Sequence, residues 1–131
     1  MKIQGEKLNP IDVNKIVDNI FGDSQHAKRK QSLSSAALGV ISSGSLIVHR
    51  IGLGMAAAQD LLGKHAVKQV DRLLSNEKLV VWDCFSSLVP YVIGARKEIV
   101  VAMDWTDFDK DKQTTICINL VTSHGRATPL L

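Results

Sequence analysis

Apolar residues recur at helical spacing through the first part of the chain. Residues 11–21 follow Asn9 and Pro10, a capping residue and a first-turn proline, and Gly22 stops the pattern. A second, longer helix is predicted from about His26 into the forties. This part of the chain is therefore expected to be helical.

A pair of shorter helices is predicted next. Gly44 and Gly52 are expected to interrupt the chain near the end of the second helix. Residues 53–62 and 64–74 then form two helices, with Gly63 making the turn between them. This pattern is typical of a helix-turn-helix protein, and it is equally that of an ordinary helical hairpin.

The segment 64–74 has two distinct faces. Its predicted buried face holds the apolar residues Ala66, Val70, Leu73 and Leu74. Its outer face collects hydrogen-bond donors: His65, Lys68, Gln69, Arg72 and, at the end, Asn76. Arginine and lysine bind guanine or phosphate, and glutamine binds adenine. The outer face thus fits the major groove of DNA, while the alternative is a solvated charged face.

After a further predicted helix at 80–93, the spacing of apolar residues changes from that of a helix to that of a strand. Residues 98–103 are apolar on both faces and predict a central strand of a sheet. Residues 114–122 alternate and predict a second strand, and 127–131 begin a third. With turns between them, including one at 107–112, these strands predict an antiparallel meander.

The predicted fold class is α+β. Residues 1–94 are expected to form a helical region, with a helix-turn-helix-like part at about 53–76, and residues 95–131 are expected to start a second domain. We expect that domain to be incomplete, because a third strand that stops at an open apolar edge is rare in globular domains. The chain is therefore interpreted as a fragment.

Composition narrows the protein class. The chain has 131 residues and 45% hydrophobic content, which is enough for one ordinary domain. Cys84 and Cys117 lie far apart, a pattern that favours a reduced protein over a disulfide or zinc scaffold. Residues 31–48 carry no charge but are rich in serine, which favours a soluble helix over a membrane span.

Charge is unevenly distributed. Residues 1–76 hold ten Lys/Arg and six Asp/Glu, whereas residues 77–131 hold six and seven. The basic part includes the cluster Lys28, Arg29 and Lys30. Such a balance favours a nucleic-acid-binding surface joined to a more acidic region.

Asp104 is the strongest candidate for metal chemistry. It follows the apolar run of residues 98–103, and a carboxylate at the end of a buried strand must be paired or bind a cation. Metal-dependent phosphoryl-transfer enzymes hold divalent ions in this way. The alternative is that Asp104 starts a solvated turn that also carries Asp107, Asp109 and Asp111.

Three sequence blocks together resemble bacterial insertion-sequence transposases of the DDE class. They are His65-Ala-Val-Lys-Gln-Val-Asp-Arg-Leu-Leu-Ser-Asn76, Val81-Trp-Asp with Val89-Pro-Tyr-Val92, and Glu98-Ile-Val-Val-Ala-Met-Asp104-Trp-Thr-Asp-Phe-Asp109. The ending, Val121-Thr-Ser-His-Gly-Arg-Ala-Thr-Pro-Leu130, continues the likeness, which covers the chain from about His26.

The resemblance implies a helical DNA-binding region and a catalytic domain of RNase H-like fold that uses Mg²⁺. Asp104 matches the first acid of the catalytic triad by position, as a metal ligand, and the second aspartate and the glutamate would lie downstream. The family also implies double-stranded DNA at transposon ends as partner, a homodimer, and a cytoplasmic, nucleoid-associated location. This chain is then expected to bind DNA without cutting it.

Two alternatives accompany this interpretation. The chain is either a non-catalytic regulator that occupies transposon ends, or a non-functional remnant that folds poorly. Open apolar strand edges in a remnant would favour aggregation. Salt-dependent DNA binding that weakens when Lys68 or Arg72 is removed would favour the regulator.

Overall fold

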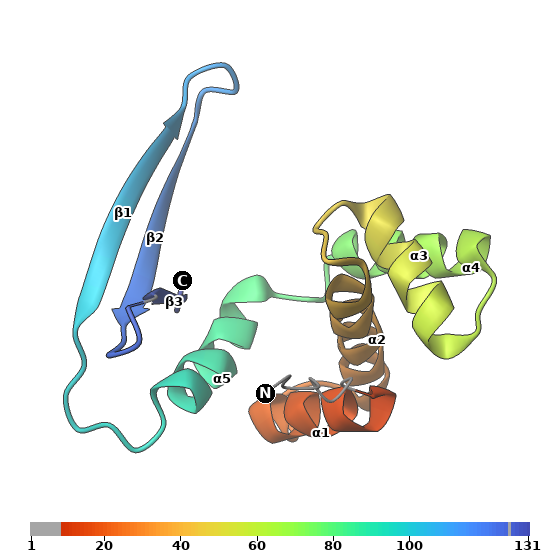
Figure 1. Ribbon diagram of the computed structural model, residues 1–131, viewed down its shortest axis with the longest axis horizontal. Coiled ribbons are helices and arrows are strands. Elements are labelled where there is room, and N and C mark those ends of the chain that lie inside the picture. The colour runs from red at the N-terminus through yellow and green to blue at the C-terminus, as the bar shows by residue number, and fades with distance from the viewer. Residues whose placement is uncertain (1–8, 126) are drawn as a thin grey trace, which may run out of the picture. The chain divides into compact units, whose positions relative to one another are not determined.

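The computed structural model describes residues 9–125 and 127–131. Its internal contacts divide the chain into two compact units, Met1–Val80 and Val81–Leu131. The first unit holds helices α1 to α4, and the second holds helix α5 and strands β1 to β3 (Figure 1). The predicted α+β class is thus confirmed, while the units divide one helix earlier than the expected boundary after residue 94.

The first helix, α1 (Pro10–Phe21), has the predicted capping residues. The side chain of Asn9 accepts a hydrogen bond from the Asp12 backbone N–H at 3.0 Å, and the Asp12 carboxylate accepts one from the Asn9 N–H. This reciprocal capping box satisfies backbone donors that a helix start leaves unpaired. Gly22 ends α1 with a φ of +48°.

Helix α2 (Ala27–Ser43) is the central element of the first unit. Its Leu38 is buried in a cluster with Val13 and Val17 of α1. On the same side, Lys30 forms an ion pair with Asp18 at 2.9 Å. Gly44 ends the helix in a left-handed conformation, as the predicted interruption requires.

Helix α3 (Val48–Gln59) begins five residues before the predicted start at residue 53. The expected interruption at Gly52 is wrong, because Gly52 lies inside α3 and is buried. A Cβ atom there would come within 2.5 Å of the Val67 Cα in α4 (Gly63–Leu74). The glycine therefore permits close helix packing instead of breaking the helix.

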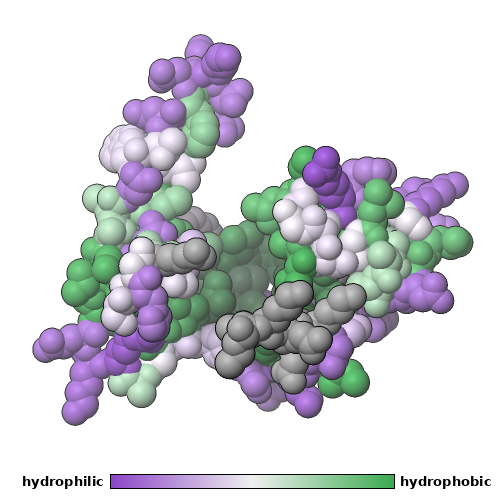
Figure 2. All heavy atoms as spheres, in the orientation of Figure 1, coloured by the Kyte–Doolittle hydropathy of each residue, from purple (hydrophilic) through white to green (hydrophobic). Residues whose placement is uncertain are grey.

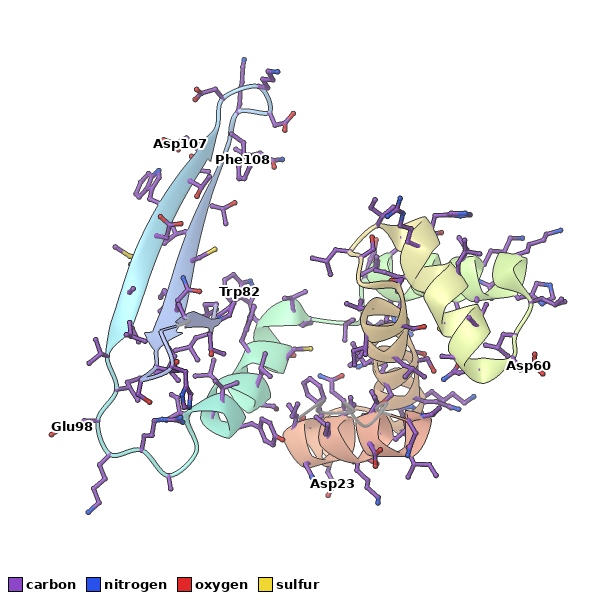
Figure 3. All side chains as sticks on the ribbon, in the orientation of Figure 1. Asp23, Asp60, Trp82, Glu98, Asp107 and Phe108 are labelled. Atoms are coloured by element: carbon purple, nitrogen blue, oxygen red, sulfur yellow. The ribbon has the colours of Figure 1, made fainter. Side chains whose placement is uncertain are left out.

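The turn between α3 and α4 also differs from the prediction. Gly63 is the first residue of α4, so it does not make the turn. Asp60 does so, in a left-handed conformation with a φ of +53°, and its side chain lies at the end of α3 (Figure 3). Aspartate tolerates this conformation better than most residues.

Helices α3 and α4 share one hydrophobic core. Ile51 and Met55 of α3 pack with Ala66 and Val70 of α4. Leu73 is also buried, as predicted for this face of α4. The prediction that Leu74 is buried is wrong. It lies one position after the buried stripe ends, and 65% of its surface is exposed.

The second unit contains α5 (Val81–Ile93) and a sheet of β1 (Val101–Phe108), β2 (Gln113–Val121) and β3 (Ala127–Pro129). The sheet order is β1-β2-β3 and both pairings are antiparallel. The predicted meander is therefore confirmed. Hydrophilic residues gather at the tip of the β1–β2 hairpin (Figure 2).

Strand β1 corrects the prediction of a buried central strand at 98–103. It starts three residues later, lies at the edge of the sheet, and all eight of its residues are exposed. Both faces of the strand are exposed: the polar Asp104 and Thr106 lie on one face, and the apolar Met103 and Trp105 lie on the other. Asp107, which was expected in the turn, lies within β1.

Among the residues that the structure describes, no single helix has both the length and the apolar character needed to cross a membrane. Helices α2 and α3 have that length and apolar character only when taken together, and they are bent by 97° relative to each other.

Candidate nucleic-acid interface

Helices α3 and α4 form a hairpin with a short connection. Residues 60–62 join them, and α2 packs against both helices. A connection of about three residues is found both in ordinary helical hairpins and in helix-turn-helix motifs. The predicted helical pair is thus present, with α4 in the position of the second helix.

The outer face of α4 presents the predicted donor residues to solvent. His65, Lys68, Gln69 and Arg72 are all exposed. Burial of Ala66, Val70 and Leu73 on the opposite face fixes this orientation. Lys64 is also exposed and lies one turn before Lys68, so it extends the basic surface, although the sequence pattern did not single it out.

A surface hollow of about 330 Å³ lies between the start of α2 and the second half of α4. Its lining residues are Lys28, Arg29, Ser32, Gln69, Arg72, Leu73 and Asn76. Three of these side chains are cationic, and the described residues that line the hollow include no carboxylate. The hollow is therefore a concentrated positive site within the first unit.

Hydrogen bonds leave the donors of the hollow available. Asn76 Oδ1 accepts from the Lys78 backbone N–H at 3.1 Å, which leaves Nδ2 to donate. Arg29 donates from Nη1 to Gln25 Oε1 at 3.5 Å, a long contact that engages one of five N–H groups. Arg29 is only half-buried and can turn its other donors to a ligand.

The backbone at the start of α2 is already capped. His26 Nδ1 accepts from the Lys28 N–H at 3.3 Å, and the His26 carbonyl accepts from the N–H groups of Arg29 and Lys30. An anion in the hollow would consequently be held by side chains and not by free helix-start amides.

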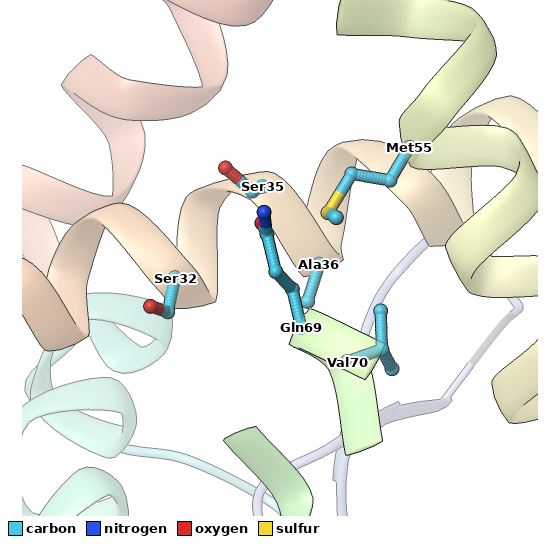
Figure 4. A pocket seen from close by; sticks show the side chains of 6 residues that line it. All are labelled: Ser32, Ser35, Ala36, Met55, Gln69 and Val70. Atoms are coloured by element: carbon cyan, nitrogen blue, oxygen red, sulfur yellow. The ribbon is translucent and has the colours of Figure 1, made fainter. Parts of the chain in front are cut away.

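Gln69 also lines a smaller cavity of about 10 Å³ between α2, α3 and α4. The other residues around it are Ser32, Ser35, Ala36, Met55 and Val70 (Figure 4). Space of this size fits about one water molecule. Gln69 is thus a wall residue between α2 and α4, and its predicted contact with adenine stays a prediction.

The structure divides the predicted basic cluster. Lys28 and Arg29 line the hollow, whereas Lys30 faces α1 through its ion pair with Asp18. On α4, Arg72 lines the hollow, while His65 and Lys68 lie outside it, toward the N-terminal half of the helix. Ser32 and Leu73 complete the hollow, and sequence patterns gave no reason to group them with Arg72.

Asp104 does not lie at the end of a strand as predicted. It is the fourth residue of β1, opposite Cys117, and the strand continues to Phe108. Within residues 9–125 and 127–131, no group of three or more His, Cys, Asp or Glu side chains is placed to hold a metal ion. One carboxylate does not fit a Mg²⁺ site, because the ion keeps its water shell unless several ligands displace it.

The carboxylate of Asp107 accepts two side-chain hydrogen bonds. Its Oδ1 accepts from Thr114 Oγ1 at 2.7 Å and from Trp105 Nε1 at 2.9 Å, near the hairpin tip (Figure 3). These hydrogen bonds, the one from Thr114 first, lower the pKa of the Asp107 carboxyl. Alternation along β1 places Asp104 and Asp107 on opposite faces, so they do not form a pair.

Comparison with protein-family models, with curated proteins and with solved structures found no match to this chain.

Proposed function

We propose that this chain acts in DNA transposition, as the DNA-binding part of a DDE-type transposase. In this proposal α3 and α4 form a helix-turn-helix unit, and the outer face of α4 enters the major groove of double-stranded DNA. The likeness of the sequence blocks to insertion-sequence transposases supports the biological role. The basic face of α4 supports the partner.

One observation carries the DNA-binding proposal. Three apolar residues anchor α4 in the core, and this anchoring turns His65, Lys68 and Arg72 together toward solvent. In helix-turn-helix proteins the N-terminal residues of the second helix contact base edges. His65 and Lys68 occupy those positions, so we assign base contacts to them and backbone contacts to Arg72.

The second unit has a less direct role in the proposal. Its three-stranded antiparallel meander is consistent with the first strands of an RNase H-like domain, and the resemblance makes Asp104 the first acid of the triad. The described residues include no group of three or more possible metal ligands, which favours a second candidate function, a DNA-binding regulator that occupies transposon ends without cutting. Both candidates require the same DNA-binding surface.

A binding assay with the full chain tests the proposal. A fluorescent duplex of mixed sequence is titrated at several salt concentrations, and bound duplexes are then selected from a random pool. We expect binding that weakens steeply with salt, because cations on the protein displace counterions from the DNA. Failure to bind any duplex at low salt would refute the proposal. Lys68→Ala should weaken binding, and Lys15→Ala on α1 is the charge-matched control for that variant.

A further inference from the structure

The hollow between α2 and α4 brings together cations that are far apart in the sequence. Lys28 and Arg29 come from the first turn of α2, and Arg72 comes from the last turn of α4. Three positive charges gathered at one place attract an anion. With no carboxylate among the described lining residues, the protein itself does not supply that anion at this site.

The chemistry of the lining selects a phosphate group. Arginine guanidinium groups bind phosphate oxygens with pairs of parallel hydrogen bonds, and the hollow offers two of them. Asn76 Nδ2 adds a neutral donor, while the buried Leu73 closes one side. A volume of about 330 Å³ is ample for a phosphodiester with part of its sugars.

We propose that this hollow holds one backbone phosphate of duplex DNA, clamped between Arg29 and Arg72. The inference rests on the proposed function, because the phosphate belongs to the strand beside the groove that α4 enters. The α2 side chains then fix the position of α4 on the DNA without reading its sequence. His65 and Lys68, which lie outside the hollow, remain available for base edges.

The salt dependence of duplex binding tests the clamp. Each phosphate contact contributes about 0.9 to the slope of log affinity against log salt concentration. If Arg29 and Arg72 share one phosphate, the double variant Arg29→Ala/Arg72→Ala loses about 0.9 from the slope, and not twice that. The loss should be equal on two duplexes of unrelated sequence.

Lys30→Ala is the matched control, because Lys30 adjoins Arg29 but faces Asp18. It should leave the slope unchanged, and circular dichroism should show that every variant keeps its helices. A double variant that binds DNA with the slope of the original chain would overturn the clamp, and so would a loss of about 1.8, which indicates two separate phosphates. If the original chain binds no duplex, the proposed function fails first, so the two failures are distinguishable.

Discussion

Gly52 of α3 lies so close to Val67 of α4 that a Cβ atom at position 52 would come within 2.5 Å of the Val67 Cα. This close approach brings the two helix backbones together at the middle of the hairpin. The position of α4 relative to α3, and thus the direction of its basic face, depends on it.

Replacing this glycine should therefore destabilise the first unit. Gly52→Ala gains about 1 kcal/mol of helix propensity, but its methyl group meets backbone atoms of α4 that cannot move aside. We expect a net loss of about 1–3 kcal/mol in the free energy of unfolding. Far-ultraviolet circular dichroism during urea unfolding measures the change.

Gly63→Ala is the control for that substitution. A Cβ atom at Gly63 would meet only the flexible end of the exposed Leu53 side chain, at 3.0 Å. Its effect should stay within about 0.5 kcal/mol. Equal stabilities for the two alanine variants would show that the Gly52–Val67 contact does not set the helix packing.

Lys68→Ala should change the sequence preference of DNA binding. Removing a base contact costs about 1–3 kcal/mol on the preferred site and relaxes specificity at one position. Competition between a duplex selected from a random pool and a mixed-sequence duplex measures this preference. Lys15→Ala should leave it unchanged, and an equal loss on both duplexes after Lys68→Ala would instead assign Lys68 to the backbone.

Lys30→Ala should affect stability slightly and DNA affinity not at all. Its partner Asp18 is 61% exposed, so the ion pair is a surface pair worth up to about 1 kcal/mol. A double-mutant cycle with Asp18→Ala, measured by thermal unfolding, isolates this energy. A fall in duplex affinity as large as that of Arg29→Ala would contradict the separation of Lys30 from the hollow.

The hairpin of the second unit should weaken in acid because of Asp107. Its hydrogen bonds lower the pKa of the folded carboxyl below 3.8, the ordinary aspartate value that applies to the unfolded chain. The stabilisation is therefore complete above 3.8 and is lost as the pH falls through the folded pKa.

The indole N–H of Trp105 reports this titration, because it donates to Asp107. Its NMR shift should change with a midpoint below 3.8, and Asp107→Asn should abolish the change. The Trp82 indole, which lies on α5, is the internal reference. A midpoint at or above 3.8 would mean that the two hydrogen bonds do not favour the ionised carboxylate.

This polypeptide should not nick DNA in the presence of Mg²⁺. Phosphoryl transfer by two metal ions needs several carboxylates, and Asp104 has no such partners among the described residues. Asp104→Asn should leave duplex affinity unchanged, because the proposed DNA-binding surface lies on α2 and α4. Conversion of supercoiled plasmid to the nicked form, lost on Asp104→Asn, would show that the residue works in a complete site.

Local signals made much of the fold predictable. The Asn9–Pro10 start of α1, the apolar stripe of α4 and the alternation in β2 each depend on residues close in sequence. Gly52 was misinterpreted because glycine both breaks helices and permits close packing, and only the partner helix distinguishes the two. Asp60 gave no comparable turn signal.

The wrong prediction of a buried strand β1 and the failure to predict the hollow between α2 and α4 have a different origin. An apolar run suggested burial for β1, but burial depends on neighbouring elements that the run itself does not encode. Except for Lys64, the basic residues of the candidate site were identified from the sequence as donors or cations. Their grouping was not, because Arg29 and Arg72 meet only through the packing of α2 against α4.

The most direct test is an NMR titration of the isotope-labelled full chain with a mixed-sequence duplex. We predict that amide and side-chain signals of Arg29, Lys68 and Arg72 shift together as DNA is added, while the Lys30 side chain and strand β1 stay unchanged. Shifts confined to the sheet, or none along α4 at saturating duplex, would contradict DNA binding by this helical face.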